Sequence, residues 1–351
     1  CHGLPAEVKV EQKLGITSRS EIGTKISVTD YVAACRDAMV KGGAAWDESV
    51  DRVGRWVDMS SPYRTMDKEY MESVWWAFKE LYEKGKIYEG EKVLVYCTNQ
   101  ATPISKSEVA MENSYKEVTD PSIYVYLKLE GEDTYLLAWT TTPWTLPANV
   151  GAAVNSDLVY SVVEYDGKSL IVAEGTEEKI FKDEKHQPLD YKVVSTIKGS
   201  ELVGKRYEPL FESHGPNAHR VLSADYVTKE DGTGVVHLAP TYGEEDFELA
   251  KKENLTIVSN VDEVGDYTSG RWQGRNIWEA NKEIAKTLVE EGKALKVEYI
   301  KHEYPHCFRC GEKLMYRAHT GWFMDIQGQK DENLAENVKT NWVPNSFKEK
   351  R

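Results

Sequence analysis

Residues 135–147 read YLLAWTTTPWTLP and mark the point where a buried strand gives way to a polar turn. The apolar run Tyr135–Trp139 is typical of a strand in a protein core. Pro143 ends this strand, because proline has no N–H to donate and restricts the residue before it. Three successive hydroxyls at 140–142 gain little inside a core, since each buried hydroxyl needs a partner. The stretch therefore predicts a polar pocket at a strand end, suited to water and a hydroxylated ligand.

The segment around this strand has the two-residue hydrophobic period of a β domain. Alternating apolar runs begin at about Ser122 and continue to Leu238. Asp166-Gly167 separates two of these runs and predicts a two-residue hairpin turn. Many short strands with Gly- and Asp-rich turns predict a compact, barrel-like β domain. A helix from about Trp278 to Glu291 follows these strands.

The first ninety or so residues have a mainly helical pattern. Their clearest helix follows Asp67 and stops at Gly85, with an apolar stripe from Met71 to Tyr82 that we expect to serve packing. The fold class is therefore α+β, mainly β. A β domain of about 115–296 is inserted into flanking segments that belong to one another.

Bulk composition narrows the class of protein. At 351 residues, two or three units are expected, and 40% hydrophobic with 29% charged residues is typical of a soluble globular protein. The sequence has no bilayer-spanning apolar run and no signal peptide, so a cytoplasmic location is expected. A net charge of −14 argues against coating nucleic acid by bulk charge, although a local basic patch stays open. Because the chain starts at Cys1 without an initiator Met, we expect an excised fragment.

A second polar motif lies about ninety residues after the threonines. Residues 232–240 read GTGVVHLAP, and GEEDF follows at 243–247. The glycines permit a tight turn, His237 lies near the end of a short strand, and Asp246 could return toward the same place. Alternatively, His237 is a satisfied strand histidine and Asp246 caps the helix that begins at Phe247. Both interpretations are compatible, because a helix N-terminus also makes a polar site.

Cysteine spacing predicts half of a zinc site. Two thiolates at the spacing of Cys307 and Cys310 can bind one Zn²⁺, and Cys97 is the best upstream candidate for the other half. Gln100 stands where a second upstream cysteine is expected, so a fourth ligand would come from His306 or water. The alternative is reduced thiols on a zinc-ribbon-like hairpin without metal.

A cluster of basic and aromatic residues gives a weaker indication of nucleic-acid binding. Arg271, Arg275 and Lys282 lie near Trp272 and Trp278, where a phosphate backbone and a stacked base could be bound. A solvated charged face explains these residues equally well.

Together these strings resemble isoleucyl-tRNA synthetases, class I aminoacyl-tRNA synthetases that carry an inserted editing domain called CP1. The chain resembles the eukaryote-like branch most closely around residues 54–56 and 72–76. Valyl and leucyl relatives characteristically have Arg where Thr142 stands. The likeness extends along the chain in the strings Cys1–Pro5, Arg64–Asp67, Tyr96–Thr98, Thr140–Pro147, Gly232–Asp246, Tyr304–Cys307 and Trp322–Phe323.

The resemblance implies a barrel-like editing domain between flanking helical and zinc-ribbon-like segments of a split Rossmann-type catalytic domain. The division it implies is a helical catalytic or connective part at 1–92, a zinc-ribbon-like stalk from 93–114 and 297–325, the editing domain at 115–296, and a return segment at 326–351.

The resemblance also implies the activity. The ATP-binding strings H-x-G-H and K-M-S-K-S do not occur here, so ligation with ATP and Mg²⁺ is expected only of a full-length parent. The implied function is post-transfer proofreading, in which the ester of Val-tRNA(Ile) is hydrolysed and Ile-tRNA(Ile) is rejected. Editing itself would need no cofactor. The implied partners are the acceptor end of tRNA(Ile) carrying valine and the rest of the synthetase, with no membrane. Alternatives are a zinc-ribbon tRNA-binding module without hydrolysis and the editing domain of a valyl or leucyl relative.

Residue roles follow from the same resemblance. Asp246 would accept hydrogen bonds from the α-ammonium of the substrate, and His237 would line the side-chain pocket and exclude isoleucine. Trp144 would pack against the terminal adenosine. A structural zinc would be held in the stalk by Cys97 and the Cys307–Cys310 pair. The ester, the terminal ribose and the attacking water would be held by the hydroxyls of Thr140, Thr141 and Thr142.

Overall fold

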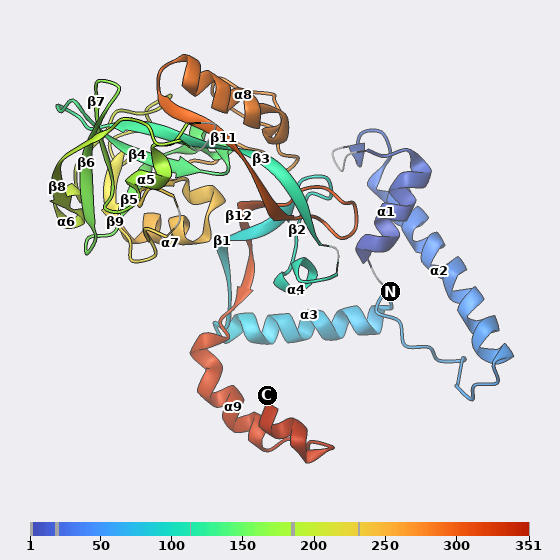
Figure 1. The fold of residues 1–351 in the computed structure, drawn as a ribbon. Coiled ribbons are helices and arrows are strands. Elements are labelled where there is room, and N and C mark those ends of the chain that lie inside the picture. Colours follow the sequence, from blue (N-terminus) through green and yellow to red (C-terminus); the bar gives the residue numbers. More distant parts are fainter. Residues whose placement is uncertain (1–2, 18–20, 113, 184–186, 231, 351) are drawn as a thin grey trace. The chain divides into compact units, whose positions relative to one another are not determined.

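The protein is described by a computed structural model that covers residues 3–17, 21–112, 114–183, 187–230 and 232–350 (Figure 1). Cys1 and His2 of the N-terminal string lie outside the described residues. The chain divides into two compact units, one formed by residues 1–91 with 320–351 and the other by residues 92–319. The split Rossmann-type flanks and the four-part division stay predictions.

The first unit is helical, as its sequence pattern predicts. Ser27 caps a helix by accepting a hydrogen bond from the Asp30 N–H, and Asp67 precedes another that ends just before Gly85, where φ is +66°. No helix in the described part of the chain is long and apolar enough to cross a bilayer. The elements are α1 (Gly3–Leu14), α2 (Val28–Arg52), α3 (Lys68–Glu83), η4 (Gln327–Gln329), α9 (Lys330–Val338) and η5 (Asn345–Lys350).

The apolar stripe of α3 is mostly exposed, so the expectation that it serves packing is wrong for this chain. No residue of α3 is buried, and Trp75 is 69% exposed. Phe78 and Tyr82 make edge-on contacts with Trp322 at ring distances of 5.7 and 5.9 Å. The pattern identified the correct helix, but little apolar surface within the described residues covers it.

The second unit contains most of the strands. Two of them, β1 and β12, continue into the first unit. The strands are β1 (Ile87–Cys97), β2 (Thr102–Pro103), β3 (Tyr115–Lys128), β4 (Thr134–Thr140), β5 (Gly151–Val154), β6 (Val159–Tyr165), β7 (Lys168–Ala173), β8 (Lys192–Lys198), β9 (Arg220–Ser223), β10 (Val236–Leu238), β11 (Ala294–Pro305) and β12 (Met315–Met324). The helices of this unit are α4 (Lys106–Val109), η2 (Pro143–Ala148), α5 (Glu177–Ile180), α6 (Gly199–Leu202), η3 (Pro240–Tyr242), α7 (Glu244–Lys252) and α8 (Ile277–Glu290).

These strands form mixed sheets rather than a closed barrel. The largest sheet has the order β11-β3-β4-β7-β6-β8, and two three-stranded sheets have the orders β10-β5-β9 and β12-β1-β2. A barrel needs its two edge strands to pair. Here β8 is an exposed edge along nearly its whole length, and α8 packs against the β11 and β3 side of the sheet (Figure 1). The prediction of a barrel-like domain is therefore wrong, whereas the α+β, mainly β composition is confirmed.

Two local predictions in this unit are confirmed. β6 and β7 pair as an antiparallel hairpin, and Asp166 and Gly167 have φ values of 47° and 71°. Positive φ at both central residues is the geometry of the type I′ turn that matches strand twist. The helix predicted from about Trp278 to Glu291 is α8, which buries Ile277, Ile284 and Leu288 in the main core.

Candidate functional site

The candidate site lies where two short strands end in proline-led turns. β4 ends at Thr140 and η2 begins at Pro143, while β10 ends at Leu238 and η3 begins at Pro240. Proline stops each strand because it cannot donate to the ladder. Since β10 packs against β4, the two ends lie close together although they are far apart in sequence.

The glycines of the G-T-G string allow β10 to approach the large sheet. Gly234 has φ +73°, and a Cβ added to it would lie 2.3 Å from the Cβ of Ala173 in β7. The Ala173 N–H donates to the Thr233 carbonyl at 2.8 Å, which fixes this close approach. Any side chain at position 234 would push β10 away from β7.

The threonine hydroxyls form a connected polar cluster. Thr140 Oγ1 accepts a hydrogen bond from the Thr142 N–H at 3.1 Å and lies 3.2 Å from Thr142 Oγ1. Thr140 is 7% exposed, whereas Thr141 and Thr142 are partly exposed. The cluster therefore has an inner, anchored hydroxyl and outer hydroxyls that a ligand can reach.

The hydroxyl of Thr145, three residues after Thr142, joins the two motifs. Thr145 Oγ1 donates to the Thr142 carbonyl at 2.9 Å and lies 2.9 Å from Nε2 of His237. Because the hydroxyl proton is already used, Nε2 of His237 must carry the proton that completes the second hydrogen bond. Burial lowers the pKa of His237 to about 4, which keeps the ring neutral at physiological pH. Nδ1 of His237 is then a buried acceptor with no hydrogen-bond partner among the described residues.

This proton arrangement gives a spectroscopic prediction. In the protein at pH 7, ¹⁵N-edited NMR should show His237 as the Nε2–H tautomer, with Nδ1 unprotonated. Thr145→Val keeps the β-branched shape but removes the acceptor, so both tautomers should become populated. Thr233→Val is a suitable control, because Thr233 lies on the same string as His237 and its hydroxyl hydrogen-bonds to the backbone of Val235. An unchanged tautomer in Thr145→Val would contradict the assignment.

Asp246 is held beside the end of β10. Its Oδ2 accepts the Ala239 N–H at 3.0 Å, and its Oδ1 accepts the Tyr226 hydroxyl at 3.4 Å. Burial raises the pKa of Asp246 to about 6, against the lowering effect of these two hydrogen bonds. The alternative that Asp246 caps a helix from Phe247 is wrong, since α7 begins at Glu244 and its N-cap is Gly243.

Trp144 of η2 follows the three threonines in sequence, and its side chain is part of the main hydrophobic core. Its backbone N–H donates to Asn281 of α8 at 3.0 Å, and its ring lies 4.9 Å from Tyr242 and 6.0 Å from Trp278. Trp144 is 3% exposed, so contact with an adenosine would first require the indole to be uncovered. That role stays a prediction, and in this structure the ring supports η2 by packing.

Three residues of this region were not singled out from the sequence. Thr145 stands inside the threonine string, but only its contact with His237, ninety-two residues later, reveals a role. The position of Tyr226 against Asp246 has no local sequence signal. Asn281 lies within an amphipathic helix and is distinguished only by its burial and its hydrogen bond to η2.

Comparison with known proteins places the chain in a family. The sequence profile described as tRNA synthetases class I (I, L, M and V) matches residues 1–351. The chain belongs to the class I tRNA synthetases. It is 42% identical over 388 residues to an isoleucine–tRNA ligase of Treponema denticola, 41% over 360 residues to one of Methanocaldococcus jannaschii, and 39% over 364 residues to the cytoplasmic isoleucine–tRNA ligase of Saccharomyces cerevisiae.

These matches cover 98–100% of this class I synthetase chain and 34–35% of the relatives. The chain therefore spans about one third of their length. Among solved structures, the cytosolic leucyl-tRNA synthetase editing domain of P. knowlesi covers 50% of this chain and 95% of its own, with 13% identity and a TM-score of 0.39. The match with the cytosolic leucyl-tRNA synthetase editing domain of P. falciparum covers 51% of this chain and 99% of that structure, with 10% identity and a TM-score of 0.42.

The synthetase chain also brings its three predicted zinc ligands together. The sulfur atoms of Cys97, Cys307 and Cys310 lie within 4.8 Å of one another, and those of Cys97 and Cys310 are 3.5 Å apart. Tetrahedral zinc with thiolates at about 2.3 Å needs sulfur separations of roughly 3.8 Å, so the three thiols fit such an ion. His306 is not part of this cluster, and its Nδ1 contacts the Tyr304 carbonyl at 2.8 Å. A fourth ligand from His306 is therefore not supported, which leaves one position for another donor.

Metal content is directly measurable. We expect protein purified without chelator to bind about one equivalent of Zn²⁺ and to lose several degrees of Tm when a strong chelator removes it. Cys307→Ser should lower the zinc content in the same way. Cys35→Ser is the matched control, because Cys35 is a free cysteine of α2 in the first unit and does not belong to the thiol cluster. Equal zinc content in both variants, or none in the wild type, would refute a metal site.

Proposed function

We propose that this chain is the editing part of an isoleucyl-tRNA synthetase and that it hydrolyses the ester of Val-tRNA(Ile) while leaving Ile-tRNA(Ile) intact. The hydrogen bond between Thr145 and His237 carries this proposal, because it joins the threonine string to the G-T-G string in one site. The overall identity to isoleucine–tRNA ligases supports the isoleucine system. In the cell the protein would act in the cytoplasm on the acceptor end of tRNA(Ile), together with the rest of the synthetase.

The need for such a site follows from a limit on recognition. One methylene contributes only about 1–3 kcal/mol to discrimination, and isoleucine against valine in synthetases is a known case of this limit. A second site that admits valine but not isoleucine removes the error that the first site cannot avoid. His237 suits this task, since it is buried and held in place by Thr145.

Asp246 supplies the contact for the substrate amino group. When ionised, its carboxylate can accept a charge-assisted hydrogen bond from the α-ammonium of an aminoacyl ester. The Ala239 N–H and the Tyr226 hydroxyl occupy one position on each oxygen and leave other lone pairs available. The ester carbonyl and the terminal ribose would then reach the outer hydroxyls of Thr141 and Thr142.

Hydrolysis by positioned water fits the proton arrangement better than covalent catalysis. Thr145 donates its proton to a backbone carbonyl and receives one from His237, so the histidine does not act on it as a base. The threonine hydroxyls are instead suited to hold water and to stabilise developing charge on the ester oxygen. The vicinal hydroxyl of the terminal ribose is available to assist.

Comparing two esters on the same tRNA tests the proposal. tRNA(Ile) charged with valine and with isoleucine is incubated separately with the chain, and the remaining ester is measured over time. Rapid loss of valine with retention of isoleucine is the expected result. Equal stability of both esters with and without protein would favour a tRNA-binding module without hydrolysis. Preferential loss of isoleucine over valine would favour the editing domain of a relative.

A further inference from the structure

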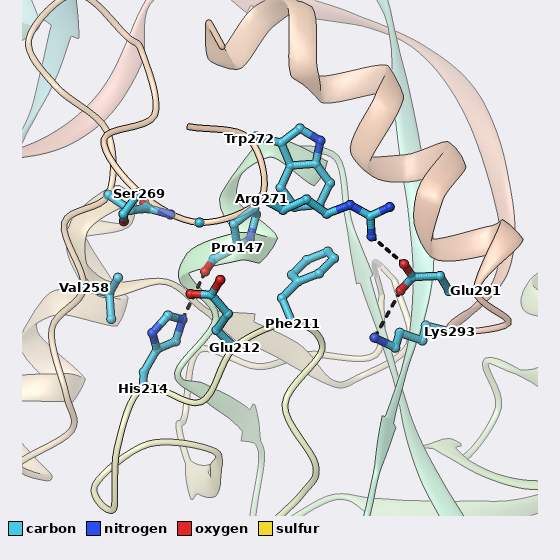
Figure 2. Close-up of a pocket in the computed structure, with 12 residues that line it drawn as sticks. Pro147, Phe211, Glu212, His214, Val258, Ser269, Arg271, Trp272, Glu291 and Lys293 are labelled. Atoms are coloured by element: carbon cyan, nitrogen blue, oxygen red, sulfur yellow. Dashed lines mark hydrogen bonds and ion pairs between the residues drawn. The ribbon is translucent and has the colours of Figure 1, made fainter. Parts of the chain in front are cut away.

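A separate cavity of about 370 Å³ is lined by Pro147, which lies near the C-terminal end of η2, whereas Thr140–Thr142 precede its N-terminal end. Figure 2 shows the residues that line this cavity. η2 contributes Pro147 to its wall, and the Pro147 carbonyl lies 3.0 Å from Nε2 of His214, which also lines the cavity. The remaining walls come from loops before β9, after α7 and around Trp272, and from the end of α8. No role in the proposed ester hydrolysis involves this cavity.

One wall of the cavity carries excess positive charge. Arg271 and Lys293 both form ion pairs with Glu291, and the Lys293 distance is 3.1 Å. Two cations share one carboxylate, so the group of Arg271, Glu291 and Lys293 carries one net positive charge, while the exposed carboxylate of Glu212 lines another part of the same cavity. A guanidinium has five N–H donors, so Arg271 can bind a phosphate while it remains paired.

The same cavity offers an aromatic surface and a hydrogen-bond acceptor. The ring of Phe211 is partly exposed and is braced edge-on by buried Trp272 at 4.9 Å. In the view of Figure 2, this ring lies between the carboxylate of Glu212 and the Arg271–Glu291–Lys293 group. An aromatic face, a cation and an exposed carboxylate within one cavity match the base, the phosphate and the amino group of a nucleotide.

We propose that this cavity binds one nucleotide, with its base against Phe211 and its phosphate at Arg271 and Lys293. Glu212 accepts a hydrogen bond from an exocyclic amino group, so cytosine or adenine is bound in preference to uracil. The nucleotide is either free in solution or part of the single-stranded end of a tRNA. Only binding of the tRNA end rests on the proposed function; binding of a free nucleotide does not. Because η2 forms both the cavity wall and the threonine site, an occupied cavity would also hold η2 in place.

Titration calorimetry with CMP and UMP tests the binding of a free nucleotide. We expect CMP to bind several-fold more tightly than UMP, and Phe211→Leu to weaken CMP on the order of tenfold, because leucine keeps apolar volume but loses the aromatic face. Arg271→Gln should weaken it similarly. Arg275→Gln is the matched control, because Arg275 lies on the same loop, pairs with Glu283 at 3.2 Å and does not line the cavity.

Uncharged tRNA(Ile), intact or trimmed of its single-stranded 3′ nucleotides, distinguishes the two sources. If the tRNA supplies the nucleotide, Phe211→Leu weakens intact tRNA but not trimmed tRNA. Arg271→Gln then lowers the slope of log affinity against log salt by about one, and Arg275→Gln does not. If Phe211→Leu and Arg271→Gln weaken the binding of CMP but leave the binding of tRNA unchanged, the ligand is a free nucleotide.

Unchanged binding of both probes in Phe211→Leu and Arg271→Gln would overturn the proposal, as would tighter binding of free valine than of CMP. Asp246→Asn should lose hydrolysis but still bind CMP, so a failure of the hydrolysis proposal is separable from a failure of the nucleotide site. Equal Tm values for the variants and the wild type exclude loss of fold as the cause.

Discussion

Asp246→Asn is expected to abolish hydrolysis of Val-tRNA(Ile) and, at the same time, to stabilise the folded protein. Asparagine keeps the shape and the acceptor for the Ala239 N–H but loses the charge that binds the α-ammonium. Removing one partner of a buried, hydrogen-bonded charge pair costs roughly 2–5 kcal/mol, so kcat/KM should fall by roughly 30- to 5,000-fold. Single-turnover deacylation measures this loss.

The stabilising effect follows from the direction of the pKa shift. Burial raises the pKa of Asp246 from 3.8 to about 6, so between these values the folded protein binds more protons than the unfolded chain. The free energy of unfolding therefore falls as pH rises through this range, by up to about 3 kcal/mol for one ionised group. Asp246→Asn removes this cost and should raise the free energy of unfolding at pH 8, with little difference near pH 4.

Urea unfolding at pH 8 and pH 4 measures this difference. Glu245→Gln is the matched control, because Glu245 is an exposed carboxylate in the same helical turn. The wild-type deacylation rate should also fall as pH drops through about 6, since protonated Asp246 no longer binds an ammonium group. A variant that is inactive and equally destabilised at both pH values would instead indicate a structural role for Asp246.

His237→Ala is expected to convert Ile-tRNA(Ile) from a rejected ester into a substrate. Truncation of a buried imidazole beside Thr145 leaves a space that can admit the extra methylene of isoleucine. Since that methylene contributes about 1–3 kcal/mol, hydrolysis of Ile-tRNA(Ile) should rise roughly 10- to 100-fold relative to hydrolysis of Val-tRNA(Ile). The ratio of the two single-turnover rates is the measurement.

His219→Gln provides the control for this change. His219 is also buried in the second unit, and burial lowers its pKa to about 4, as it does for His237. Its Nε2 accepts the His214 N–H at 3.2 Å, a contact that glutamine can replace. An unchanged ratio in His237→Ala, or the same rise in His219→Gln, would show that His237 does not set the size limit.

Much of the local structure could be predicted because it depends on neighbouring residues. Gly85 ends α3, and Asp166-Gly167 adopts the left-handed backbone of a tight hairpin. Pro143 and Pro240 end strands wherever the rest of the chain lies, since a missing N–H is a local property. The threonine string, the G-T-G string and the cysteine pair could be identified as polar or thiol sites for the same reason.

The relation between these strings was decided by the tertiary structure. The openness of the large sheet depends on β8 remaining an exposed edge, which no residue of β8 signals by itself. The pairing of Thr145 with His237, the raised pKa of Asp246 and the burial of Trp144 all depend on segments separated by many residues. Desolvation and hydrogen-bond partners are properties of packed surroundings, so they cannot be read from the residues alone.

The sequence by itself determined which segments carry polar groups at strand ends, and the tertiary structure decided what those groups do. Backbone preferences of proline and glycine act over a few residues, so the strings at 140–147 and 232–246 specify their own turns. Proton positions and charge states arise only when β10 packs against β4, which brings Thr145 to His237, and when the residues around α7 desolvate Asp246. The chemistry of this site is therefore a product of long-range packing acting on locally specified turns.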